Sequence, residues 1–135
     1  VISSERKHSG EIRVCVESSL PLSYLWQDLT ARDRAIMMFG KLRVWDTAAN
    51  NGVLIYLLLC EHAIEIVADR GLNRHVSAEQ WAGIVAGMRE AFRTRQYEQG
   101  LMAAVATVDE LLHRHFPLGA DAHNPNELPD APHLR

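Results

Sequence analysis

The amino-acid sequence predicts a three-layer α/β/α sandwich built around a small mixed β-sheet. Strand-like and helix-like segments alternate, and a strand–helix–strand unit implies a parallel pair with a right-handed crossover. Two neighbouring apolar segments predict an antiparallel hairpin, and two final helices can cover the sheet. The 135 residues, 47% hydrophobic and 23% charged, suit one domain with a globular core.

The first strand is predicted over Glu11 to Ser18. Apolar and polar side chains alternate along it with a period of two, as in a half-buried strand. Before it, Val1 to Lys7 has the pattern of the last turns of a helix that is cut off at its start. Gly10 suits the left-handed position that often follows a helix. After the strand, Leu20 to Leu29 is predicted to be a loop.

A helix is predicted to begin at Thr30 and to end near Arg43 to Asp46. The Thr30 hydroxyl can cap backbone donors, and the helix dipole favours the carboxylate of Asp33 in the first turn. Apolar residues then recur at helical spacing, which predicts one face packed on the sheet: Ala35, Met38, Phe39 and Leu42.

A hairpin is predicted next. Asn50-Asn51-Gly52 is typical of a turn. Val53 to Cys60 is nearly all apolar, as a strand covered on both faces would be. Glu61-His62 is a plausible two-residue turn, and Ala63 to Ala68 is predicted to return antiparallel to the strand before it.

Two helices and a tail complete the chain. Ser77 to Gln80 forms a capping box before an apolar helical stripe, and a second helix is predicted from Tyr97. After Phe116 the hydrophobic pattern stops, and four of the five prolines follow. The sequence therefore predicts a domain over residues 1–116, with its first helix truncated, and a flexible or draped tail over residues 117–135.

Composition argues against several functional classes. With 14 basic and 17 acidic residues, the net charge of -3 gives no basic field for nucleic acid. The longest apolar run is far shorter than the ~20 residues of a membrane helix, so no transmembrane segment is predicted. Cys15 and Cys60 lie in apolar runs and are predicted to be buried, reduced thiols. We expect a cytoplasmic or membrane-peripheral protein.

Several motifs, in order along most of the chain, resemble those of the TPM domain family. One is a first-strand entry with a Gly-x-Ile-x-Val pattern, and another is an Asn-Asn-Gly before the central strand. A third is the next strand with its glycine, and a fourth links the last two helices. The corresponding segments are His8 to Val14, Trp45-Asp46 with Asn50 to Leu54, Ile64 to Leu72, and Phe92 to Gly100.

The resemblance covers roughly residues 2 to 116 and is to short bacterial members, with a tail similar to Asn126 to Asp130. It implies a sandwich fold and, as in some members, a polar metal-binding cleft with calcium as the usual ion. Acid phosphatase activity has been attributed to a plant member, and other members have membrane-associated roles. The chain departs from the family in one place, since Asp69-Arg70-Gly71 stands where many members carry Gly-x-Gly.

The hairpin register brings polar residues to one edge of the predicted sheet. With a two-residue turn, Leu54 faces Asp69 and Gly52 faces Gly71, and the first strand begins at the same edge. Carboxylate and amide oxygens suit Ca²⁺ or, as the alternative, Mg²⁺, and no organic cofactor is predicted. The same residues can instead be turn formers and a loop cap. The predicted ligands are Asp46, Asn50, Asn51, Asp69 and Glu11.

Catalysis at this edge would require metal-activated water. Neither cysteine begins a C-x5-R motif, and no Asp-x-Asp pair is present. Arg70 is a candidate phosphate ligand, since a guanidinium binds phosphate bidentately, and is otherwise an exposed charge. His113 and His115 lie two apart on a helix and point to different faces, which argues against a zinc site.

Two functions from different classes follow. The first is a binding or assembly module that contacts a protein partner, membrane-associated in some members of the family, with a divalent ion ordering its cleft. The alternative is a weak metal-dependent acid phosphatase that uses the same cleft.

Overall fold

The computed structural model describes residues 10–117 and 133–134. The helix end predicted at Val1 to Lys7 and most of the predicted tail lie outside the described residues. The elements in chain order are β1 (Glu11–Glu17), α1 (Leu22–Trp26), α2 (Ala31–Lys41), β2 (Gly52–Leu58), β3 (Ala63–Ala68), the 3-10 helix η1 (Arg70–Leu72), α3 (Ala78–Arg93), α4 (Tyr97–His115) and β4 (His133–Leu134).

The sheet is mixed, in the strand order β3-β2-β1-β4. β1 pairs in parallel with β2, so that Glu11 lies opposite Gly52, and β2 pairs antiparallel with β3. β4 adds a short parallel pairing to β1 at Cys15 and Val16. The predicted parallel pair and hairpin are thus confirmed, whereas the proline-rich tail gave no indication of β4.

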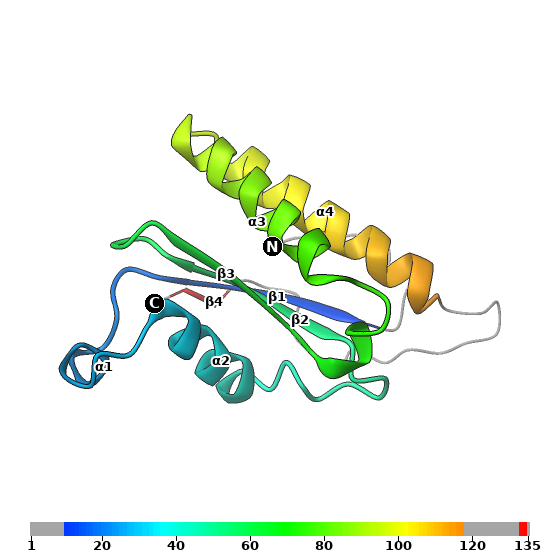
Figure 1. Cartoon of the computed structure of the whole chain (residues 1–135), viewed down its shortest axis with the longest axis horizontal. Helices are drawn as coiled ribbons and strands as arrows, with labels where there is room; N and C mark the ends of the chain where they lie inside the picture. The colour runs from blue at the N-terminus through cyan, green and yellow to red at the C-terminus, as the bar shows by residue number, and fades with distance from the viewer. Residues whose placement is uncertain (1–9, 118–132, 135) are drawn as a thin grey trace.

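Helices cover both faces of the sheet (Figure 1). On one face, α3 and α4 pack on the side chains of alternate strand residues, such as Val14 and Ile55, through Met88 of α3 and Leu112 of α4. On the other face, α2 packs on a second set that includes Tyr56. The predicted three-layer sandwich is therefore confirmed, and β2 is buried along its whole length.

The helix starts are capped as their sequences predict. The Thr30 hydroxyl accepts from the backbone N–H of Asp33, whose carboxylate accepts from the Thr30 N–H at 2.7 Å. Ser77 and Gln80 make the same reciprocal pair at the start of α3. These contacts satisfy donors that a helix leaves without intrahelical partners.

Several local predictions were wrong. The segment predicted as a loop contains α1, a five-residue helix. β1 has buried residues on both faces rather than on one, and Cys60 is exposed because β2 ends two residues before it. Gly10 does not have a positive φ; a Cβ there would lie 2.8 Å from a methyl group of Leu112. Close packing, rather than a left-handed conformation, accounts for that glycine.

Among the described helices, none is both long enough and apolar enough to cross a membrane.

Candidate functional site

The predicted site lies at the sheet edge where β1 and β2 begin. The parallel register places Glu11 opposite Gly52. The chain leaving β3 returns to the same point, because the N–H of Asp69 donates to the carbonyl of Gly52 at 2.9 Å. Three separate segments of the chain therefore meet at this edge, which we call the β1–β2 entry edge.

The loop before β2 adopts a tight, hydrogen-bonded shape. Asn50 has a φ of 54°, in the left-handed region that Asn tolerates better than most residues. The N–H of Asn51 donates to Thr47 Oγ1 at 3.0 Å, and Asn51 is fully buried. The carbonyl of Asn50 accepts from the N–H of Gly71 at 2.8 Å, which joins this loop to the segment after β3.

Two glycines allow this close approach. A Cβ on Gly71 would lie 2.4 Å from the carbonyl oxygens of both Ala49 and Asn50. A Cβ on Gly52 would lie 2.0 Å from the carbonyl oxygen of Val44. Both glycines permit close backbone approach: Gly71 brings the Asp-Arg-Gly segment against the Asn-Asn-Gly loop, and Gly52 lies against the backbone of Val44.

The predicted ligands differ in their burial and in the interactions that their side chains make. Glu11 and Asn51 are buried, whereas Asp46 and Asp69 are partly exposed. Asp46 forms an ion pair with Arg43, with 2.7 Å between Oδ2 and Nη2. Asp69 Oδ1 accepts from the N–H of Arg70 at 2.7 Å and so caps η1.

The β1–β2 entry edge has two predicted roles, turning the chain and binding a cation. The turn role has direct support in the Asn50 conformation and the Asp69 cap. The candidate metal-ligand atoms at the edge are carboxylate and amide oxygens, the type that Ca²⁺ and Mg²⁺ prefer. Within residues 10–117 and 133–134, however, no three His, Cys, Asp or Glu side chains gather closely enough to hold an ion. The exposed Arg70 side chain lies beside the cap and remains a predicted phosphate ligand.

The hairpin register differs from the predicted one by two residues. Leu58 rather than Cys60 pairs with Ala63, so four residues form the turn instead of two. A shift of two residues keeps every side chain on its predicted face, because the side-chain period of a strand is two. Asp69 therefore still reaches the β1–β2 entry edge.

A buried polar cluster at the opposite end of β1 was not predicted. Arg34 of α2 donates through Nε and Nη2 to the two carboxylate oxygens of Glu17, at 2.7 and 2.8 Å. The hydroxyl of Tyr56 donates to Glu17 Oε1 at 2.6 Å, and all three side chains are buried. The sequence does indicate that Arg34 is buried, because Arg34 falls on the apolar stripe of α2 formed by Ala31, Ala35 and Met38.

The cluster keeps its groups in one protonation state. The hydrogen bonds to Glu17 are the largest cause that raises the pKa of Arg34. Burial, and then the hydrogen bond to Glu17, raises the pKa of Tyr56. Arg34 and Glu17 form a bidentate pair, and removing either partner would leave the other charge buried and uncompensated. We assign the cluster to the core.

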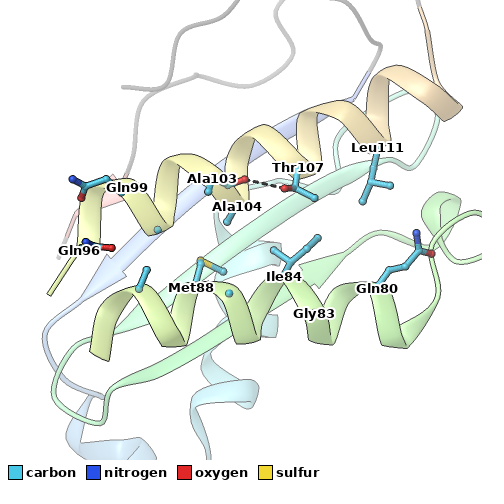
Figure 2. A pocket seen from close by; sticks show the side chains of 13 residues that line it. Gln80, Gly83, Ile84, Met88, Gln96, Gln99, Ala103, Ala104, Thr107 and Leu111 are labelled. Carbon is cyan, nitrogen blue, oxygen red and sulfur yellow. Dashed lines mark hydrogen bonds between the residues drawn. The ribbon is translucent and has the colours of Figure 1, made fainter. Parts of the chain in front are cut away.

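Two cavities also lay outside the sequence prediction. One is a groove of about 550 Å³ between α3 and α4. It is lined by small residues such as Gly83, Gly87 and Ala103 and by glutamines near its ends (Figure 2). Thr107 lies on its wall with its hydroxyl bonded to the carbonyl of Ala103 at 3.0 Å. The other, of about 840 Å³, lies between the β2–β3 turn and the α3–α4 turn.

Comparison with known proteins assigns the family. Residues 2–111 match the model of the TPM domain. The chain is 28% identical to the BA42 protein from the psychrophilic bacterium Bizionia argentinensis, whose NMR structure matches with a TM-score of 0.81 over 96% of this chain and 83% of that one. The N-terminal domain of a P. gingivalis protein shares the fold, at 22% identity and a TM-score of 0.65, over 83% of this chain and 71% of that one.

None of the curated proteins matches the chain. The motif resemblance is nevertheless confirmed by the family model, which covers most of the sequence. This chain belongs to the TPM domain family.

Proposed function

We propose that this chain is a non-catalytic binding module whose β1–β2 entry edge is ordered by a divalent cation, calcium or magnesium. One observation carries the proposal: the loops that hold Asn50 and Asp69 are joined by main-chain hydrogen bonds at 2.8 and 2.9 Å. Oxygen donors from distant parts of the sequence therefore lie at one edge. A cation would join the two loops further, using carboxylate, amide and main-chain carbonyl oxygens.

A protein partner is part of the proposal. Large apolar side chains are exposed on α1 and at the outer face of α2, and Trp26 is the most exposed of them at 82%. Exposed apolar side chains that gather on neighbouring elements are typical of contact surfaces. They support a binding or assembly role, and they have no use in phosphate hydrolysis. The side chains are Leu22, Leu25, Trp26, Ile36 and Met37.

The cation can be tested by thermal unfolding in chelator, then with calcium and with magnesium. An ion at about 100 times its dissociation constant should add about 2.7 kcal/mol of apparent stability. Asp69→Asn removes a carboxylate charge, while an Asn can still cap η1. We expect the ion-dependent shift to disappear or shrink in Asp69→Asn, with the unfolding temperature in chelator little changed.

Asp28→Asn is the matched control. Asp28 lies between α1 and α2 with a φ of 56°, which Asn also tolerates, and its loss should leave the ion response intact. Equal stability with and without every ion would show that the predicted ligands are turn formers only. Turnover of p-nitrophenyl phosphate that is lost both on chelation and in Asp69→Asn would instead support the phosphatase alternative.

A further inference from the structure

The larger cavity lies at the end of the sandwich opposite the β1–β2 entry edge. It occupies about 840 Å³ between the turn that joins β2 to β3 and the turn that joins α3 to α4. Its inner wall is apolar and comes from both layers, with Leu57 and Ile64 from the sheet and Phe92 and Leu101 from the helices. Its volume falls within the roughly 300–1,000 Å³ of small-molecule sites.

The rim of this cavity is cationic. Arg89, Arg93 and Arg95 line it, and Glu98 is the one acidic side chain among its lining residues. This is notable in a chain whose net charge is -3. The side chains of Arg89 and Arg95 form no ion pair with any residue in the described part of the chain. All three arginines are exposed, so their charges face solvent at the mouth.

Arg93 is also available to an anion. It pairs with Glu90 on the same helix, but their side chains are 71% and 64% exposed. Solvent screens such a pair strongly, and exposed pairs of this kind contribute little stability. An anionic ligand at the mouth could therefore meet three guanidinium groups, each able to donate two parallel hydrogen bonds to a carboxylate.

The position of the cavity is consistent with a ligand site. It lies beside Val16 and Leu57, close to the carboxyl ends of the parallel strands β1 and β2. Ligands of open α/β sheets bind outside the carboxyl ends of the strands. The β1–β2 entry edge is at the amino ends of the same strands, so the two sites are separate.

We propose that this cavity binds a free fatty acid, with its alkyl chain between the sheet and α3–α4 and its carboxylate at Arg89 and Arg95. The apolar wall matches an unbranched alkyl chain, and the cationic rim matches one negative head group. A neutral ligand would form no ion pair with the arginines, and a cationic ligand would be repelled by them. The proposal is independent of the divalent cation at the other end of the sheet.

Isothermal titration with sodium dodecanoate, below its micelle-forming concentration and in the presence of chelator, tests the inference. We expect binding that is about tenfold tighter than that of dodecan-1-ol, which corresponds to about 1.4 kcal/mol, because only the carboxylate can accept charge-assisted hydrogen bonds from the arginines. Arg89→Gln should weaken dodecanoate binding by about tenfold. Arg95→Asn should do the same, and Asn suits the positive φ of 63° at that position.

Arg114→Gln is the matched control, because it removes the same charge near the far end of α4 and should leave binding unchanged. Leu101→Trp fills the cavity and should abolish binding without lowering the unfolding temperature; if this variant fails to fold, the arginine variants still decide the question.

The proposal is overturned by absence of dodecanoate binding, by equal binding of dodecanol, or by full affinity in both arginine variants. Binding to phosphatidylglycerol vesicles without binding to monomeric dodecanoate would also overturn it, and would indicate a lipid surface instead.

Discussion

At the scale of single residues, glycine has two distinct roles in this chain. Gly71 lets two backbone segments touch, since a Cβ there would lie 2.4 Å from two carbonyl oxygens. Gly83, within α3, has no atom within 4 Å of the position a Cβ would take, apart from its chain neighbours and the backbone of its own helix. The first glycine is required by its surroundings, whereas the second only adds conformational freedom to the unfolded chain.

This difference predicts opposite effects of the same substitution. Gly71→Ala should lower the free energy of unfolding by about 1–3 kcal/mol, because the loop before β2 must move away from the new methyl group. Gly83→Ala should raise it by roughly 0.5–1 kcal/mol, because Ala is the better helix former. Urea denaturation of both variants gives the two values. A neutral or stabilising Gly71→Ala would contradict the close approach described above.

Residue-scale features also mark where sequence reasoning reached its limit. The Asn50–Gly52 turn and the return of Asp69 to the same edge could be predicted, because turn residues and strand period carry that information. The Glu17–Arg34 pair could not be predicted, because the local sequence does not indicate which residue of the packed helix will contact a buried strand carboxylate. Arg34 on an apolar stripe indicates a buried cation, but its partner depends on tertiary packing.

At the scale of elements, the end of α4 docks on the segment that precedes α3. The ring of His115 stacks on that of His75 with 4.6 Å between centroids, and Phe116 meets His75 edge-on. A helix C-terminus favours a positive charge. Burial, together with His75 and the cation of Arg114, nevertheless lowers the pKa of His115. The docked arrangement therefore favours the neutral ring.

Stability should consequently depend on pH at the acidic side of neutrality. The unfolded chain binds a proton at His115 more readily than the folded chain does. The contribution of the neutral His115 ring to the free energy of unfolding is therefore complete above pH ~6.5 and is lost as the pH falls below it. His115→Gln should give a flatter dependence of the urea midpoint between pH 7.5 and 5.5 than the unmodified chain. Parallel pH profiles for the two proteins would argue against the effect.

Element lengths explain which segments could be predicted. The long helices and the hairpin strands were identified because caps and apolar periods extend over many residues. α1 was missed because its five residues are too few to show a period, and no side chain caps it. β4 was missed because two residues carry no pattern at all.

At the scale of the whole molecule, the layers differ in how firmly they are held. β2 is central, with β1 and β3 on either side and helices on both faces, and all seven of its residues are buried. α1 has no buried residue. Backbone groups in the centre of a core are released only by global unfolding, whereas exposed turns open locally.

Amide hydrogen exchange measured by NMR should reveal this order. The amides of Ile55 and Tyr56 should exchange only with the free energy of global unfolding, and should follow the full denaturant dependence. Those of Leu25 and Trp26 should exchange orders of magnitude faster, with little response to low denaturant. Similar rates in β2 and α1 would show that the sandwich opens as one loose unit.

The central position of β2 also has a consequence for the newly made chain. Val53 to Leu59 is a seven-residue apolar run without charge or proline, the type of segment that self-associates when exposed. Of the two strands that flank β2 in the sheet, β3 is separated from β2 by only four residues, whereas α1 and α2 separate β1 from β2. Rapid pairing with β3 would therefore shield one edge of the segment during synthesis. Substitutions that delay this pairing should therefore reduce soluble yield before they reduce the affinity of either site.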